Sequence, residues 1–268
     1  MMKRLMVFFV TLFLFFPSNY IYLSADLPGK TSSPEAGMSM GHYMTWFYNE
    51  LNDDMGKPDF QVFKKALTGF FVLKSEGKLS RDFITLVDFT RSSNEKRLWI
   101  IDVSKMKIVH RSLVSHGRNS GELFASRFSN IPSSYQSSLG FYVTGSTYTG
   151  KHGTSLLLEG QEPGINDKAR ERAIVIHSAD YVSESFIQQY GRLGRSQGCP
   201  AIPIEGHREV ISKIAGGSCL FIYYPDETYQ ASTQLNAEDK ALAGMTRFYA
   251  EIPGFKEVFG IINNDIHS

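Results

Sequence analysis

The sequence predicts an α+β fold that is mainly β, a β-rich sandwich or barrel that follows an N-terminal helical segment. Apolar residues recur at three- and four-residue spacing over about 42–52 and 59–74, which is the period of an amphipathic helix. From about residue 84 this period gives way to short apolar runs separated by polar turns, which indicates strands. The predicted strands lack the regular helical crossovers of a doubly wound sheet.

The predicted elements follow the chain in order. The two helical stretches form a segment, residues 41–75, that we expect to pack on the β-rich domain. After it, apolar runs separated by Ser, Asn and Lys turns predict a β-meander over 84–88, 97–103 and 107–114. Further strands are predicted at 140–144, 147–151, 155–158, 172–177 and 219–224, with a helix at about 205–214.

The N-terminus has the pattern of a secretory signal. Two basic residues, Lys3 and Arg4, precede an apolar run over 5–16, and a small-residue exit follows at Ser24 and Ala25. We therefore expect export to the periplasm or cell envelope; the alternative is an uncleaved membrane anchor, since residues 20–23 can extend the apolar run. The predicted organisation is a signal peptide over 1–25, a linker over 26–40, the helical segment over 41–75, the β-rich domain over 76–228 and a C-terminal extension over 229–268.

The charge of the chain is balanced. Its 268 residues include 28 basic and 27 acidic ones, for a formal net charge of +1, and no long basic run occurs. A nucleic-acid-binding surface needs clustered positive charge, so we expect no nucleic-acid partner. The charge balance does not indicate whether the protein is a monomer or an oligomer.

The chemistry of the chain is expected at Cys199, which ends a glycine- and arginine-rich loop. His177 closes an apolar, strand-like run twenty-two residues earlier. A thiol must become a thiolate to attack a carbonyl, and a neighbouring imidazole can take its proton. Gly198 frees the backbone to turn N–H groups toward a developing oxyanion. Cys199 and His177 are therefore the predicted nucleophile and base.

Two alternatives remain open at this point. A free cysteine often only packs, as we expect of Cys219, which lies in a continuous apolar run. In an exported protein the two cysteines, Cys199 and Cys219, can also form a disulfide, which would remove the nucleophile. A zinc site is not predicted, because no spacing of histidines and cysteines resembles a zinc motif.

Several motifs resemble the catalytic domain of L,D-transpeptidases, cysteine enzymes that remodel bacterial peptidoglycan. In that family a histidine is followed after some two dozen residues by Ser-x-Gly-Cys, and Ser196, Gln197, Gly198 and Cys199 match this pattern after His177. The resemblance spans about residues 60–225 and is closest to a divergent, signal-bearing branch of the family. The other matching motifs, in the same order as in that branch, lie at 115–121, 128–130, 137–142, 150–153, 174–183 and 191–201.

The resemblance implies a reaction and a role for each site residue. Cys199 would be the nucleophile, and His177 would be the general base and then the general acid. Ser196 would order the loop, and N–H groups around Gly198 and Cys199 would hold the oxyanion. The implied reaction is acyl transfer, in which the thiolate attacks the amide after the L-centre of diaminopimelate in a peptidoglycan stem tetrapeptide. D-Alanine leaves, the acyl group passes to an amine of a second stem, and no cofactor or metal takes part.

Two positions depart from the family pattern. The family usually follows its histidine with glycine and places an arginine two residues after the cysteine, where this chain has Ser178 and Ala201. We hypothesise that Arg192 or Arg195 replaces the missing charge from the other side of the loop. Two histidines beside glycine in loop-like segments are candidates to line the cleft or to orient the base; the open alternative is a loop histidine that only bonds the backbone. The predicted substrate-binding residues are thus Arg195, Arg192, His152, His116 and Ser178.

Other functions stay open beside the transpeptidase. With water as the acceptor, the same site would be an L,D-carboxypeptidase. A catalytically silent peptidoglycan-binding domain of the same fold needs no reactive thiol. A thiol peptidase unrelated to the wall would cleave all-L peptides and ignore the L,D junctions of stem peptides. Only the enzymes need an accessible cysteine of low pKa.

Overall fold

The computed structural model describes residues 39–151 and 153–250. The chain divides into two units, 1–33 and 34–268, and all described residues belong to the second. The predicted signal peptide, nearly all of the predicted linker and the last part of the predicted C-terminal extension lie outside the described residues. No helix within the described part is long and apolar enough to cross a membrane.

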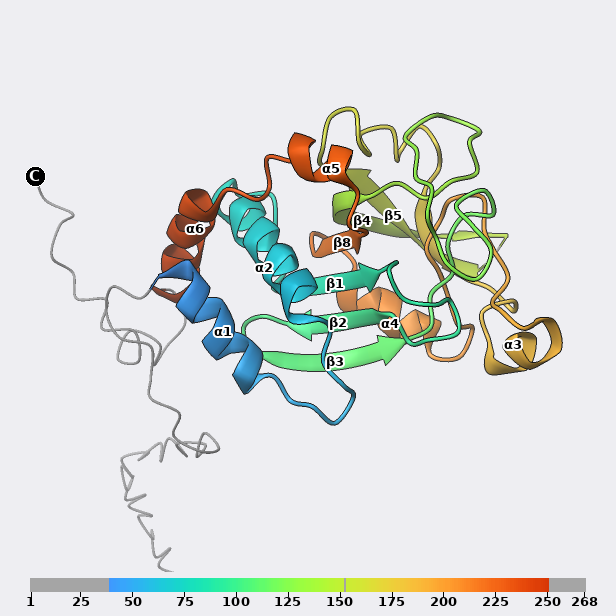
Figure 1. The fold of residues 1–268 in the computed structure, drawn as a ribbon, viewed down its shortest axis with the longest axis horizontal. Coiled ribbons are helices and arrows are strands. Elements are labelled where there is room, and N and C mark those ends of the chain that lie inside the picture. Colours follow the sequence, from blue (N-terminus) through green and yellow to red (C-terminus); the bar gives the residue numbers. More distant parts are fainter. Residues whose placement is uncertain (1–38, 152, 251–268) are drawn as a thin grey trace, which may run out of the picture. The chain divides into compact units, whose positions relative to one another are not determined.

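Eight strands of the described part form one sheet in the order β3-β2-β1-β8-β4-β5-β6-β7 (Figure 1). The strands are β1 (Phe83–Asp88), β2 (Leu98–Asp102), β3 (Lys107–Ser112), β4 (Gly140–Gly150), β5 (Gly153–Gly160), β6 (Val175–Ser178), β7 (Ala201–Ile202) and β8 (Cys219–Tyr223). The helices are α1 (Met40–Glu50), α2 (Phe60–Ser75), α3 (Glu184–Tyr190), α4 (His207–Ile214), α5 (Glu227–Ser232) and α6 (Glu238–Ala250).

The pairing of the strands produces a nearly closed, barrel-like sheet. The predicted meander is confirmed, because β1, β2 and β3 pair in antiparallel fashion. At the centre, β8 runs parallel to β1 and antiparallel to β4. Beyond β3, the N–H of Ser115 donates to the carbonyl of Ala201 in β7 at 2.9 Å, which brings the two ends of the sheet together. The predicted mainly β, α+β fold is confirmed.

The central strands are buried on both faces. Every residue of β2 and β8 is buried, which explains why these strands appear in the sequence as continuous apolar runs rather than as alternating ones. One face is covered by α2, which packs on β1 and β8. Figure 1 shows α4 behind the strands, where it packs on β5 and β6. Cys219 in β8 is fully buried, as predicted for a core cysteine.

The predicted helical segment is confirmed by α1 and α2. Each helix begins at a polar cap, and the Asp59 carboxylate accepts from the N–H of Gln61 at 2.8 Å. Glycine allows α2 to approach the sheet closely, because a Cβ at Gly69 would lie 2.1 Å from the ring of Phe141. The buried side chains of both helices belong to the main hydrophobic core, so this segment is part of the domain.

The C-terminal part of the chain differs from the expectation of a mere extension. Its described residues form most of α5 and all of α6, and α6 packs on α2. A Cβ at Gly244 would lie 2.2 Å from the carbonyl oxygen of Phe71, so glycine permits this contact. The hydroxyl of Tyr249 also accepts from that of Tyr43 in α1. The apolar residues of α6 recur at helical spacing and complete the core over α2.

Two local predictions need correction. The expected strands 140–144 and 147–151 are one strand, β4, whose pairing with β5 shifts register between Thr144 and Thr147. The helix α3 was not predicted, although Ser183 caps its start and Gly191 ends it in the left-handed conformation. Its residues show no buried side chain, so no apolar stripe marked it in the sequence.

Candidate active site

A cleft of about 650 Å³ lies beside β6 and the loop that precedes β7, and both Cys199 and His177 line it. We call it the Cys199 cleft. The parallel pairing of β6 with β7 sets His177 opposite Ala201, two residues beyond the cysteine. The residues that line the cleft are Arg118, Ser133, Tyr135, Tyr148, Gly150, Lys151, Ser155, Arg172, Ala173, Val175, His177, Tyr181, Arg195, Ser196, Gln197 and Cys199.

Cys199 is a free thiol and remains partly exposed. Its sulfur accepts from the N–H of Val175 at 3.5 Å, and the thiol points to the carbonyl of Ala173 at 3.7 Å. Cys219 is also free, so the two cysteines do not form the disulfide that the sequence left open. Burial raises the pKa of the Cys199 thiol, while the Val175 N–H and the charge of Arg172 oppose the rise. At neutral pH the group therefore rests as a thiol and needs a base.

His177 is buried at the end of β6. Its Nδ1 lies 2.9 Å from the carbonyl oxygen of Ser178, an acceptor that requires the hydrogen to sit on Nδ1. In that tautomer Nε2 has the lone pair that a general base needs. Ser178 contributes its carbonyl to this arrangement, and its side chain does not line the cleft. The Ser178 group that meets His177 is thus its backbone carbonyl.

Ser196 ties the nucleophile loop together. Its Oγ accepts from the N–H of Gly198 at 3.0 Å and donates to the carbonyl of Cys199 at 2.6 Å. Gly198 has a φ of 122°, and a Cβ there would lie 2.8 Å from the carbonyl oxygen of Gln136. Because the Gly198 N–H already bonds Ser196, an oxyanion would have to draw on the N–H of Cys199 and on other groups of the cleft.

Arg172 is a cation of the cleft that the sequence analysis missed. Its Nη1 donates to the carbonyl of Ser129 and its Nη2 to that of Gln136, each at 2.6 Å. It thereby holds the loop 129–138 against the cleft, and its charge lowers the pKa of Cys199. The available signal was its place in the turn that leads into the strand of His177.

The two arginines proposed to replace the family arginine that this chain lacks lie in different places. Arg195 lines the cleft, although its Nη1 lies 2.6 Å from Glu122 and donates to the carbonyl of Gly121. Arg192 does not line it, since its Nε pairs with the same Glu122 carboxylate at 3.0 Å. Of the two, only Arg195 lies at the cleft. Arg172 provides the charge that acts on Cys199.

The structure places His116 outside the lining of the cleft, and its Nε2 lies 3.3 Å from the carbonyl oxygen of Gly121. The ring is buried, and Arg97 donates to its Nδ1 at 2.8 Å. Burial, with the charge of Arg97 beside it, lowers the pKa of His116 to about 3, so the ring is neutral. Its backbone carbonyl accepts from the N–H of Ser196 at 3.0 Å, which makes it a support of the nucleophile loop. The other predicted histidine, His152, lies outside the described residues.

Several residues that line the cleft have strained backbone conformations. Three residues that line it adopt left-handed backbone conformations although they have side chains: Ser133, Tyr135 and Ala173, with φ values of 60°, 55° and 52°. Such conformations persist only where the surroundings hold them. For Ser133 and Tyr135, the hydrogen bonds of Arg172 and Asn119 to the loop 129–138 do so.

The charge of the cleft is one-sided. Four lining residues, Arg118, Lys151, Arg172 and Arg195, are basic, and no acidic residue of the described part lines it. A cleft with one sign of charge attracts a ligand of the opposite sign. The described residues contain no cluster of histidine, cysteine, aspartate or glutamate suited to a metal ion.

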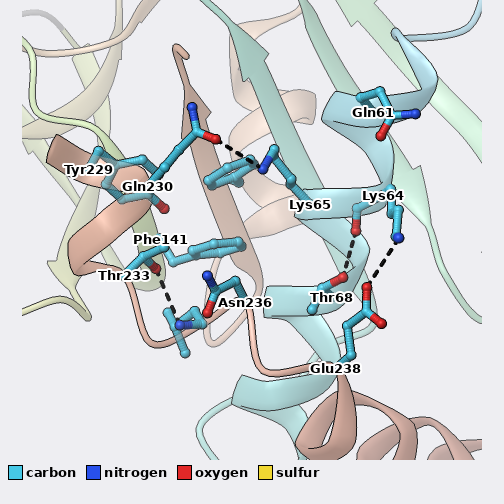
Figure 2. Close-up of a pocket in the computed structure, with 12 residues that line it drawn as sticks. Gln61, Lys64, Lys65, Thr68, Phe141, Tyr229, Gln230, Thr233, Asn236 and Glu238 are labelled. Atoms are coloured by element: carbon cyan, nitrogen blue, oxygen red, sulfur yellow. Dashed lines mark hydrogen bonds and ion pairs between the residues drawn. The ribbon is translucent and has the colours of Figure 1, made fainter. Parts of the chain in front are cut away.

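A second pocket, of about 220 Å³, lies between α2 and α5 (Figure 2). Phe141, near the start of β4, lines it, whereas Tyr148 and Gly150 line the Cys199 cleft near the end of the same strand. Figure 2 shows two pairs of its side chains in contact, Lys65 with Gln230 and Lys64 with Glu238. The second is an ion pair at 3.1 Å. No cysteine or histidine lines this pocket.

Comparison with known proteins places these observations in a family. The model of the L,D-transpeptidase catalytic domain matches residues 54–223, more than half of the chain. Among solved structures, the chain is similar to an L,D-transpeptidase from Mycobacterium smegmatis, at 10% identity over 53% of this chain and 59% of that one, with a TM-score of 0.33. It is also similar to an L,D-transpeptidase from Mycobacterium tuberculosis, at 12% identity over 53% of this chain and 58% of that one, with a TM-score of 0.35.

A third similar structure is the helical cell shape determining protein Pgp2 from Campylobacter jejuni, at 13% identity over 63% of this chain and 62% of that one, with a TM-score of 0.36. The chain spans about three fifths of the length of these solved structures. No curated protein matches the chain.

Proposed function

The chain belongs to the L,D-transpeptidase catalytic domain family, and on that basis we propose that it is an exported cysteine acyltransferase acting on peptidoglycan stem peptides. One observation carries the proposal. A free cysteine, Cys199, and an imidazole oriented through Nδ1, His177, line the same cleft. This is the nucleophile and base pair that acyl transfer through a thioester needs. Export agrees with the signal predicted at residues 1–25, because peptidoglycan lies outside the cytoplasmic membrane.

The first half of the reaction forms a thioester. Nε2 of His177 takes the proton of Cys199, and the thiolate attacks the carbonyl carbon of the amide after the L-centre of diaminopimelate. The N–H of Cys199, with other donors of the cleft, stabilises the negative oxygen of the tetrahedral intermediate. The intermediate collapses as the imidazolium of His177 gives its proton to the departing nitrogen, and D-alanine leaves. Because burial raises the pKa of Cys199, this proton transfer has to accompany attack.

The second half returns the enzyme to its starting state. An amine of a second stem attacks the thioester, His177 takes the proton that this amine loses, and Cys199 departs as a thiolate that the imidazolium reprotonates. Water in place of the amine would yield a trimmed stem, the product of an L,D-carboxypeptidase. The one-sided positive charge of the cleft supports a substrate with several carboxylates, as stem peptides have.

The test is release of D-alanine from a disaccharide tetrapeptide by protein that begins after Ala25. We expect release by the wild type and by Cys219→Ala, since Cys219 is buried and does not line the cleft, and none by Cys199→Ala or His177→Ala. Chromatography of the products then names the acceptor, since a crosslinked dimer indicates an amine and a tripeptide indicates water. A folded wild type that releases no D-alanine would contradict the proposal and favour the silent wall-binding domain.

A further inference from the structure

Arg118 differs from the other cations of the Cys199 cleft. It lines the cleft and is exposed, and within the described part of the chain its guanidinium makes no hydrogen bond or ion pair. By contrast, Arg172 donates to the loop 129–138, and Arg195 is neutralised by Glu122. The donors of Arg118 are therefore available to a ligand.

The guanidinium of Arg118 is nevertheless held in place. Its central carbon lies 4.0 Å from the centroid of the Tyr135 ring. Stacking of this kind occupies the face of the guanidinium and leaves its N–H edges, which match a carboxylate in a two-pronged geometry. A flexible lysine such as Lys151 offers no such fixed fork.

The backbone on both sides of this contact is fixed as well. The N–H of Arg118 donates to the carbonyl of Ser196 at 2.8 Å, which ties it to the nucleophile loop. Tyr135 has its left-handed φ of 55°, and its carbonyl accepts from the N–H of Asn119 at 3.1 Å. A Cβ at Gly117 would lie 2.5 Å from that same carbonyl oxygen, so glycine permits the two segments to meet. Strain and close packing thus place the ring under the arginine.

We infer that Arg118, stacked on Tyr135, is a carboxylate-binding residue of the Cys199 cleft that recognises a free carboxylate of the peptide substrate. The inference rests on the proposed function for the identity of that peptide. The binding chemistry itself depends only on the cleft. Arg118 would fix the acyl donor by its charge while the scissile amide lies at Cys199.

The first experiment needs no substrate. Iodoacetate and iodoacetamide alkylate the same thiol, but only iodoacetate has a carboxylate, so the ratio of their rates at Cys199 reports carboxylate recognition. In Arg118→Gln we expect this ratio to fall about fivefold or more, with the iodoacetamide rate unchanged. Arg208→Gln is the matched control, because Arg208 is exposed in α4 and does not line the cleft. An unchanged ratio in Arg118→Gln would overturn the inference.

The second experiment measures binding by the Cys199→Ala protein, which cannot turn the peptide over. By calorimetry, Arg118→Gln should weaken the binding of a stem tetrapeptide on the order of tenfold. Binding of the fully amidated peptide should not change. Equal weakening of both peptides would contradict carboxylate recognition. If this selective loss is found but the wild type releases no D-alanine, the proposed function fails and the carboxylate site stands. If the wild type releases D-alanine but both proteins bind the tetrapeptide equally, the carboxylate site fails and the proposed function stands.

Discussion

The N–H of Val175 lies 3.5 Å from the sulfur of Cys199, so the strand that presents the base also donates to the nucleophile. Val175 and His177 are alternate residues of the short strand β6. The relative placement of the two reacting groups is therefore set by one strand and by the register of β6 with β7, and the loop that carries the cysteine is held by further bonds.

The charge of Arg172 should be visible in the titration of Cys199. Burial raises the pKa of this thiol and Arg172 opposes the rise, so Arg172→Met should raise the pKa further. Because the thiolate is the reactive form, alkylation by iodoacetamide at pH 7 should slow on the order of tenfold, and the rate profile should move to higher pH.

Two variants separate charge from loop support in that experiment. Arg170→Met removes an exposed arginine whose Nη1 lies 2.8 Å from Glu159, and its profile should match the wild type. Arg172→Lys keeps the charge but cannot reproduce the bonds to the loop 129–138, and its profile should stay near the wild type. A shift of equal size in Arg172→Lys and Arg172→Met would assign the effect to the loop instead.

Gly198 should tolerate no side chain. A Cβ there would meet the carbonyl oxygen of Gln136 at 2.8 Å, and the residue has a φ of 122°. We expect Gly198→Ala to lose about 2–3 kcal/mol of unfolding free energy and nearly all D-alanine release. Gly164→Ala is the control, because its φ is 77° but nothing lies within 4 Å of a Cβ there. It should cost about 1 kcal/mol, and an equal loss in both variants would argue against the clash.

His116 should make the fold sensitive to acid. Its pKa is lowered from 6.5 in the unfolded chain to about 3 in the fold, so between these values the unfolded state binds more protons. Stability from this group is complete above pH 6.5 and falls as the pH drops toward 3. His116→Gln lacks this titration, so its Tm should fall less than that of the wild type between pH 7 and pH 4, by on the order of 5 °C. Parallel Tm profiles would contradict a buried neutral His116.

The helix α6 should be a structural part of the domain. A Cβ at Gly244 would lie 2.2 Å from the carbonyl oxygen of Phe71, so Gly244→Val should cost about 2–4 kcal/mol in urea unfolding. Ala243→Val tests the same substitution at an exposed position of the same helix and should cost only about 0.5 kcal/mol. A similar small cost at both positions would mean that α6 does not pack on α2.

Patterns within short stretches of the sequence predicted individual helices and strands. The apolar spacing that led to α2 and the continuous run in β8 both report burial directly. The parallel pairing of β8 with β1 joins residues more than a hundred positions apart, and no periodicity records which strands meet. The α6 helix was not predicted, although its buried residues recur at helical spacing in the sequence; only its packing on α2, a distant segment, had no local signal.

The candidate site likewise contains residues that the sequence predicted and residues that it did not. Cys199, Ser196 and His177 stand in a recognisable motif, and the structure brings their segments together. Arg172 and Tyr135 lie outside the matching motifs, and Arg118 lies in one of them, 115–121, that does not indicate its place in the cleft. The relation of all three residues to the cleft arises from loops that meet only in the folded chain. His116 was misplaced for a similar reason, since a histidine beside glycine gives no sign that Arg97 will cover its ring.

The most direct test of the account is intact-mass spectrometry of the protein quenched in acid during turnover of the tetrapeptide, and separately after reaction with a carbapenem. We expect a covalent acyl adduct that peptide mapping assigns to Cys199, absent from Cys199→Ala and retained in Cys219→Ala. An unmodified wild type under both conditions, or an adduct that persists in Cys199→Ala, would contradict the assignment of Cys199 as the acylated nucleophile.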